Sequence, residues 1–208
     1  MQCSDCSRVV RPVVAVDIDG TLGDYHGHFL AFAEQYLQMN LPDGHDGSGE
    51  FSEALGLPKH LYRQIKLAYR QGGMKRCMPV YDGANLLVDT VKELGAELWV
   101  TTTRPWMRLD NVDPDTRFWL EHHGIAYDAL LYDENKYKLL ADTVGHERVV
   151  AVVDDLPEMI DQARGAGLQA MHRWTRWNRA ERRVPGDNDL HTITHWVADM
   201  IDRFNNNA

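Results

Sequence analysis

The sequence predicts an α/β protein in which one parallel sheet lies between two layers of helices. Four short apolar runs have the length and composition of buried strands, and they cover residues 13–16, 97–101, 129–132 and 149–153. Stretches with helical periodicity separate the later runs, and each run gives way to polar residues at its carboxyl end. Strands that alternate with helices at this spacing form βαβ units, so we predict a Rossmann-like three-layer core. A small helical insertion follows the first strand.

The predicted strands lack the alternation that is typical of a half-exposed sheet. Residues 13–16 read Val-Val-Ala-Val, and residues 149–153, Val-Val-Ala-Val-Val, are the most continuous β-branched run in the chain. Strands that are apolar on both faces are typical of parallel sheets covered by helices on both sides.

Four helices are predicted around these strands. One carries an apolar face, closed by Gly95, that consists of Ala84, Leu87, Val88, Val91 and Leu94. A second begins at Asp113-Pro114, and a third begins at Pro157. A final helix carries an apolar stripe formed by Leu190, Ile193, Trp196, Val197, Met200, Ile201 and Phe204.

The alternation of strands and helices breaks after the first strand. Residues 29–39 and 58–71 have helical periodicity, and a loop rich in Gly and Asp, residues 42–50, separates them. We therefore predict a core formed by residues 1–24 and 79–208, and a helical insertion formed by residues 25–78.

Composition and charge narrow the class of partner. The chain has 22 Lys and Arg against 31 Asp and Glu, a net charge of −9, so no basic footprint for DNA or RNA is visible overall. A small anion is easier to accommodate, because a metal ion or a local cation can reverse the sign of the charge inside one cleft. No window approaches the ~20 consecutive apolar residues of a membrane span, and the N-terminus lacks the pattern of a signal peptide. We expect a cytoplasmic protein without membrane contact.

The three cysteines, Cys3, Cys6 and Cys77, are too few for a disulfide framework. The run Cys3-Ser4-Asp5-Cys6 has half of a zinc-type spacing, but no second Cys-x-x-Cys follows it. We expect a reduced, frayed tail here rather than a zinc site.

Chemically useful side chains follow all four predicted strands. They are Asp17 with Asp19, the Thr-Thr-Thr-Arg run at 101–104, Lys136, and Asp154 with Asp155. The carboxyl ends of parallel strands meet at one edge of a sheet, so we expect these groups to share a cleft. The run Asp-Ile-Asp-Gly alone is also compatible with a plain turn. The groups at the other strand ends favour a site.

Four carboxylates in one cleft require either protons or a cation. Unit charges ~4 Å apart repel each other by about 4 kcal/mol at an effective dielectric constant of 20. Oxygen ligands with few His or Cys nearby suit Mg²⁺, which bridges carboxylates and phosphate. We predict Mg²⁺ as the cofactor, with Asp17, Asp19, Asp154 and Asp155 as its ligands.

The remaining groups fit the requirements of a phosphate ester. A threonine hydroxyl, the Arg104 guanidinium and the Lys136 ammonium would donate to the non-bridging oxygens. Asp17 would attack phosphorus and form an aspartyl-phosphate. Asp19 would protonate the leaving oxygen and later activate water. The predicted catalytic residues are therefore Asp17, Asp19, Thr102 and Lys136.

This arrangement resembles the haloacid dehalogenase superfamily of Mg²⁺-dependent aspartyl-phosphate phosphatases. Its four motifs have counterparts here in order, over about residues 13–172, and these are Asp17-Ile18-Asp19-Gly20-Thr21, Thr102, Lys136 and Asp154-Asp155. Thr101 and Thr103 remain alternatives to Thr102. Thr102 is preferred because Thr-Thr-Arg-Pro then lies where such enzymes often carry Thr-Gly-Arg-Pro. Lys138 remains an alternative to Lys136, which would begin an amphipathic helix. The resemblance implies that the insertion is a cap that selects small substrates.

Two groups within the superfamily are similar to this chain in local sequence. Residues 20–25 and 79–84 resemble the 5′(3′)-deoxyribonucleotidases, which implies that Tyr25 helps to enclose a nucleobase. Thr102-Thr103-Arg104 and residues 113–120 resemble the 3′-phosphatase domain of phage polynucleotide kinases, in which the arginine contacts the phosphate. We predict a (deoxy)nucleotide monophosphatase, with a polynucleotide 3′-phosphatase as the alternative. The predicted substrate-binding residues are Arg104, Thr103, Tyr25 and Gly20.

Two observations leave further alternatives. The fold is compatible with a binding module without turnover, although all of the residues that the chemistry needs are present. Residues 173–183 form a basic and aromatic stretch with Trp174, Trp177 and five arginines. This stretch is compatible with stacking on a base, but a packed tail whose arginines extend to solvent is favoured.

Overall fold

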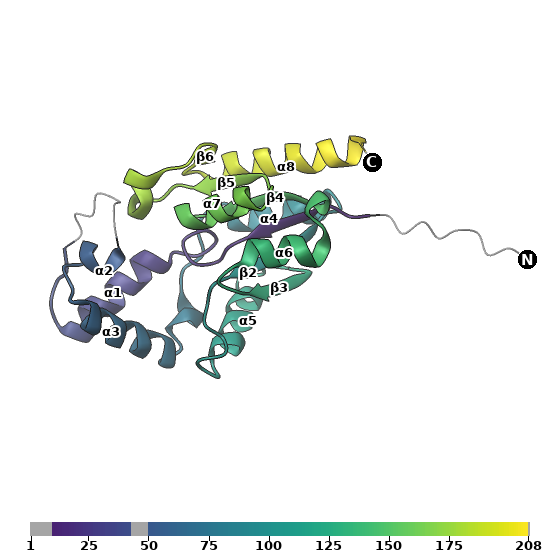
Figure 1. The fold of residues 1–208 in the computed structure, drawn as a ribbon. Helices are drawn as coiled ribbons and strands as arrows, with labels where there is room; N and C mark the ends of the chain where they lie inside the picture. The colour runs from purple at the N-terminus through teal and green to yellow at the C-terminus, as the bar shows by residue number, and fades with distance from the viewer. Residues whose placement is uncertain (1–9, 43–49, 208) are drawn as a thin grey trace, which may run out of the picture.

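In a computed structural model, the protein contains one sheet of parallel strands with helices on both faces (Figure 1). The structure describes residues 10–42 and 50–207. The strands are β1 (Val13–Val16), β2 (Glu97–Thr102), β3 (Ala129–Tyr132), β4 (Val149–Asp154), β5 (Ala170–Arg173) and β6 (Gly186–Asp187). They lie in the order β3-β2-β1-β4-β5-β6, and every pair is parallel. The predicted α/β core is confirmed.

The helices fill the intervals between the strands and the region after β1. The α-helices are α1 (Tyr25–Leu37), α2 (Phe51–Ala54), α3 (Lys59–Gln71), α4 (Ala84–Glu93), α5 (Val112–His122), α6 (Lys136–Val144), α7 (Pro157–Gly165) and α8 (Leu190–Asn207). Three 3₁₀ helices accompany them, η1 (Met74–Cys77), η2 (His146–Arg148) and η3 (Arg176–Glu181). No helix in the described ranges is both long and apolar enough to cross a membrane.

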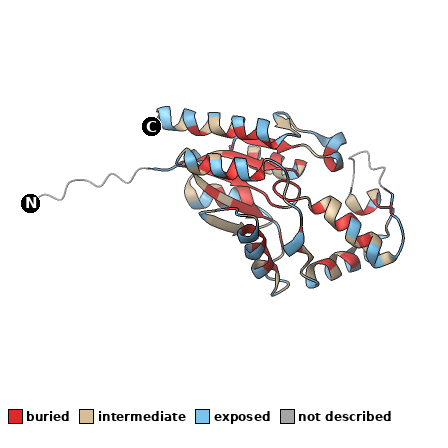
Figure 2. Ribbon diagram, turned by 180° about the vertical axis from the view of Figure 1, so that it is seen from behind, coloured by how far each residue is buried: buried red, intermediate tan, exposed pale blue. Residues whose placement is uncertain are grey.

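The two faces of β1 bury different sets of helices. Val14 and Val16 pack in one apolar cluster with side chains of α4, α5 and α8, whereas Val13 and Ala15 pack in another with α6 and α7. All four residues are fully buried, and Figure 2 shows red central strands between helices that are partly exposed. Successive side chains of a strand point to opposite faces, so an unbroken apolar run is needed to fill both layers.

The helices α1, α2 and α3 lie together at one end of the sheet (Figure 1). The segments at the two ends of this helical region meet, because the Asp24 N–H donates to the Pro79 carbonyl at 2.8 Å. The Asp24 side chain caps α1 by accepting from the Gly27 N–H at 3.0 Å. This cap explains why α1 begins at Tyr25, earlier than the predicted start at residue 29.

The structure adds elements that the sequence did not predict. The strand β5 was not predicted, because it carries the polar residues His172 and Arg173 and lacks an apolar run. All four of its residues are nevertheless buried. The short helix α2 and strand β6 were also missed. Cys3, Cys6 and residues 43–49 of the predicted loop 42–50 lie outside the described residues, so the prediction of a reduced tail remains a prediction.

Candidate active site

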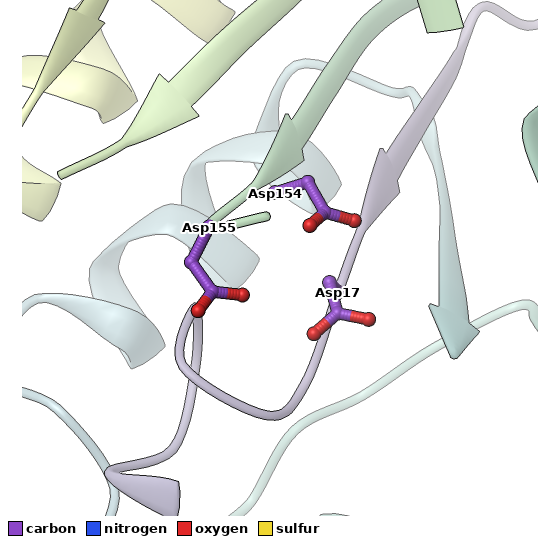
Figure 3. Close-up of side chains that lie close together, drawn as sticks. All are labelled: Asp17, Asp154 and Asp155. Atoms are coloured by element: carbon purple, nitrogen blue, oxygen red, sulfur yellow. The ribbon is translucent and has the colours of Figure 1, made fainter. Parts of the chain in front are cut away.

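Three carboxylates meet where β1 and β4 end side by side in the sheet (Figure 3). Asp17 follows β1, Asp154 is the last residue of β4, and Asp155 follows it. One oxygen of each carboxylate lies within 4.8 Å of the others, and all three residues are at most 5% exposed. We call Asp17, Asp154 and Asp155 the carboxylate cluster. The sheet order brings together acids that are far apart in the sequence, as the strand-end pattern predicted.

One buried ammonium group lies against this cluster. Lys136, the first residue of α6, places its Nζ 2.5 Å from Asp17 Oδ1 and 2.7 Å from Asp154 Oδ2. The same Nζ donates to the Thr101 carbonyl at 3.2 Å, and the Lys136 side chain is fully buried. Lys138 is exposed and pairs with Asp142 one helical turn away at 2.6 Å. The structure therefore places Lys136, and not Lys138, at the carboxylates.

Further side chains hold the cluster in position, and sequence reasoning missed them. The Tyr137 hydroxyl donates to Asp154 Oδ2 at 2.5 Å. The Asp155 carbonyl accepts from His172 Nε2 at 2.9 Å and from the Asn178 amide at 2.7 Å. His172 Nδ1 accepts from the Arg183 N–H at 2.8 Å, so the proton of this neutral ring lies on Nε2. No local pattern around positions 172 or 178 indicates these contacts.

The cluster carries more negative charge than Lys136 can balance. Burial raises the pKa of Asp17 to about 7, with the Asp154 and Asp19 charges acting in the same direction and Lys136 opposing them. Burial and the charges of Asp154 and Asp17 raise the pKa of Asp155 well above its ordinary value. Asp155 Oδ1 is buried and has no hydrogen-bond partner among the described residues. Buried oxygens with an unpartnered acceptor are a donor set that fits a hard divalent cation.

Gly20 lies directly against this cluster. Its φ of +98° is in the region that favours glycine, and a Cβ at this position would overlap the Asp155 carboxylate. The Gly20 N–H donates to the Gly23 carbonyl at 2.8 Å, within the turn that follows β1. The structure thus gives Gly20 a packing role beside Asp155.

Asp19 belongs to a separate charged group. Its carboxylate accepts from Arg104 Nε at 2.9 Å and from Arg104 Nη2 at 2.6 Å, and it forms an ion pair with Lys75 of η1. Arg104 also donates from Nη1 to the Thr116 hydroxyl at 2.8 Å. Burial alone would raise the pKa of Asp19, but Arg104 and Lys75 outweigh burial and hold that pKa well below its ordinary value. We call Asp19, Arg104 and Lys75 the bridging group, because Lys75 lies in the insertion and the other two lie in the core.

The remaining predicted site residues differ in how deeply they are buried near these two groups. Thr101 and Thr102 end β2 and are buried, and the Thr102 hydroxyl accepts from the Arg104 N–H at 3.2 Å. Thr103 is exposed. Tyr25 is 9% exposed at the start of α1, and Lys75 Nζ lies 4.2 Å from the centre of its ring. Lys75 was missed by sequence reasoning, since nothing in Met-Lys-Arg-Cys distinguishes it from a solvated turn.

A cavity of about 360 Å³ opens beside Asp155, between the insertion and the core. Its aromatic wall consists of His26, Phe51 and Trp177, whose rings contact each other with centroids 4.9 to 5.7 Å apart. Its remaining wall includes the acidic residues Glu50, Glu158 and Glu181. We call it the acidic cavity.

The fold is that of known hydrolases. No protein-family model and no curated protein matches the sequence. A predicted phosphatase from Clostridium acetobutylicum matches the structure with a TM-score of 0.66 at 16% identity, over 91% of this chain and 99% of its own. A HAD family hydrolase from Deinococcus radiodurans R1, solved with bound phosphate and sodium, matches with a TM-score of 0.64 at 12% identity, over 92% and 96%. A predicted phosphoglycolate phosphatase from Haemophilus somnus matches with a TM-score of 0.61 at 18% identity, over 91% and 99%.

These matches confirm the haloacid dehalogenase-like fold that the four motifs predicted. At identities below 20% they establish the arrangement of the chain and not its chemistry, which depends on the side chains at the site.

Proposed function

We propose that this protein is a Mg²⁺-dependent phosphomonoester hydrolase that works through an aspartyl-phosphate. The observation that carries the proposal is the buried carboxylate cluster with Lys136 against it, at the edge of the sheet where the strands end. The fold of known hydrolases and phosphatases supports this class of reaction.

Asp17 is the proposed nucleophile. Lys136 holds Asp17 Oδ1, which leaves Oδ2 to attack phosphorus while the ester P–O bond breaks and its electron pair leaves with the alcohol oxygen. Mg²⁺ bound by Asp17, Asp154 and Asp155 would supply positive charge to the phosphoryl oxygens. Lys136 adds a charge that stays in place through both displacements.

Asp19 is the proposed acid and base. Arg104 and Lys75 keep it ionised in this structure, and that form accepts a proton from the water that hydrolyses the aspartyl-phosphate. To protonate the leaving oxygen in the first step, Asp19 has to be released from at least one of these cations. Thr102 and Arg104 remain the proposed donors to the phosphate, with Gly20 and Thr103 beside them.

We propose a nucleoside monophosphate as the substrate, with a neutral nucleoside as the leaving group. The acidic cavity next to Asp155 is of the size that holds small ligands, and its aromatic wall offers ring surface to a base. Among the described residues, the cavity is lined by three glutamates, of which Glu50 pairs with Lys59 at 3.0 Å, and by no Lys or Arg. This lining opposes a polyanionic leaving group, which argues against a polynucleotide 3′-phosphate. Tyr25 remains a proposed contact of the nucleobase.

A substrate panel tests the proposal. Purified protein with Mg²⁺ is offered deoxynucleoside 5′- and 3′-monophosphates and a 3′-phosphorylated oligonucleotide, and phosphate release is measured. We expect release from the monophosphates and none from the Asp17→Asn variant. Preference for the oligonucleotide would overturn the substrate class. Binding of the panel without any release would favour the binding module.

A further inference from the structure

A second cavity, of about 430 Å³, lies around the segment that follows β5. Trp177 lines both this cavity and the acidic cavity. Among the described residues, no member of the carboxylate cluster lines the new cavity. Its other walls include Asp24 and Tyr81. These two residues lie on the two segments that join the insertion to the core, and the Tyr81 hydroxyl donates to Asp24 Oδ1 at 3.0 Å. We therefore call it the hinge pocket.

The lining of the hinge pocket is strongly basic. Four arginines, Arg173, Arg176, Arg179 and Arg182, line it together with one carboxylate, Asp24. Asp24 Oδ1 accepts from the Gly27 N–H and from the Tyr81 hydroxyl, and the four guanidinium groups outnumber its single charge. Arg179 and Arg182 are exposed, and neither forms an ion pair within the described part of the chain. The charge of this lining is therefore opposite in sign to that of the acidic cavity, which Trp177 also lines.

Arg173 is the residue that most clearly indicates the charge of a ligand for this pocket. It is only 8% exposed, and its Nη1 donates to the carbonyls of Trp174 and Asn188, which are neutral acceptors. Its Nε is buried without a hydrogen-bond partner, and no carboxylate of the described residues pairs with it. Burial lowers the pKa of Arg173 from its ordinary value. The Asp155, Asp187 and Asp189 charges act on Arg173 from a distance, but no carboxylate of the described residues forms an ion pair with it. A buried guanidinium without a direct ion pair is costly, and an anion in the pocket would offset that cost.

The aromatic side chains hold the basic groups in place. Arg182 lies over the ring of Trp174 at 4.6 Å, and Arg173 lies 5.2 Å from the centre of the Tyr81 ring. The Trp174 indole donates to the Arg183 carbonyl at 3.1 Å, which fixes the ring. Guanidinium groups arranged in this way suit the planar, bidentate recognition of oxyanions.

We propose that the hinge pocket binds a phosphate group, outside the catalytic carboxylates. The volume exceeds that of a single phosphate, so the group comes either as inorganic phosphate or as the phosphoryl end of a larger small molecule. A ligand here contacts both segments that connect the insertion to the core. The proposal does not depend on the proposed function, because binding requires neither Mg²⁺ nor turnover.

Phosphate binding in EDTA tests the proposal. Without a metal ion, the carboxylate cluster repels an anion, so saturable binding reports the hinge pocket. Inorganic phosphate is titrated at constant ionic strength, and the tryptophan fluorescence that Trp174 and Trp177 contribute is followed. We expect the Arg173→Gln variant to bind at least tenfold more weakly than the wild type.

The double variant Arg179→Gln/Arg182→Gln guards against misfolding, because both positions are exposed. We expect it to lose at least tenfold in affinity, while Arg203→Gln, an exposed arginine of α8, leaves the affinity unchanged. Absence of saturable binding in the wild type overturns the proposal. So does wild-type affinity in the folded double variant.

Adenosine 5′-monophosphate distinguishes the two sources of the phosphate group. Affinity equal to that of inorganic phosphate identifies the free ion, and at least tenfold tighter binding, lost in the double variant, identifies the phosphoryl end of a larger molecule. Tighter binding of a 3′-phosphorylated oligonucleotide than of either would overturn the assignment to a small anion.

Discussion

The carboxylate cluster and the bridging group are neighbours that balance charge in opposite ways. Lys136 pairs with Asp17 and Asp154 and is the one cation beside the three described carboxylates, whereas Asp19 pairs with both Arg104 and Lys75. The first group has unsatisfied negative charge, and the second has positive charge in excess. The difference shows that a cluster with an excess of negative charge can accept a cation, whereas a group whose carboxylate pairs with two cations joins distant segments of the chain.

The largest expected effect comes from removing the nucleophile of the carboxylate cluster. The Asp17→Asn variant keeps the shape of the side chain but cannot form the aspartyl-phosphate, so we expect kcat to fall by about 10⁴-fold. The measurement is Mg²⁺-dependent phosphate release. Asp142→Asn removes an exposed acid that pairs with Lys138 and is the matched control, with unchanged kcat. Wild-type turnover by Asp17→Asn would rule out the covalent mechanism.

The next effect comes from removing the one cation of the cluster. Lys136→Met leaves buried carboxylates without a partner, and we expect the free energy of unfolding to fall by about 3–5 kcal/mol in urea denaturation. Lys138→Met is the control, since this exposed pair with Asp142 contributes at most about 0.5 kcal/mol. Equal effects of the two variants would contradict the assignment of Lys136.

A smaller effect is expected from filling the cluster with metal. Mg²⁺ at 100 times its dissociation constant should stabilise the folded protein by about 2.7 kcal/mol, measured as a rise in the unfolding midpoint that EDTA reverses. Asp155→Asn should stabilise the metal-free protein, because it relieves repulsion, and should weaken the response to Mg²⁺. A full Mg²⁺ response in Asp155→Asn would exclude Asp155 as a ligand.

The smallest effect concerns the bridging group. A double-mutant cycle with Lys75→Met and Asp19→Asn should give a coupling energy of about 1–3 kcal/mol in unfolding, because this pair is largely buried. The exposed pair Arg117 and Asp113 on α5 is the matched control, with an expected coupling of about 0.3–0.5 kcal/mol. Coupling no larger than that of the control would mean that the ion pair does not join the insertion to the core.

Local patterns predicted the part of the site that comes from strand ends. Asp17, Lys136 and Asp154 each follow an apolar run or begin a helix, and the sheet brings such positions together whatever the loops do. The same reasoning located β1, β2, β3 and β4 but missed β5. Its sequence, Ala-Met-His-Arg, is buried only because His172 finds hydrogen-bond partners from other segments.

Local sequence patterns did not predict the contacts within the bridging group. The sequence predicted that Asp19 lies with Asp17, but it did not predict that the turn after β1 brings the Asp19 carboxylate to the Arg104 guanidinium. The contact of Arg104 with phosphate stays a prediction. The contact with Lys75 depends on how the insertion rests on the core, which no spacing within either segment encodes. Buried ion pairs between distant segments follow from packing rather than from periodicity.

Gly20 shows that empty space can be as specific as a functional group. The Asp155 carboxylate occupies the volume that any side chain at position 20 would need. An alanine there would displace the Asp155 carboxylate, which is a proposed metal ligand, so the absence of a side chain at position 20 fixes where an acidic oxygen lies. In a scan of single substitutions, Gly20→Ala should weaken the response to Mg²⁺ as Asp155→Asn does, because the new side chain displaces the carboxylate and the φ of +98° disfavours any residue but glycine.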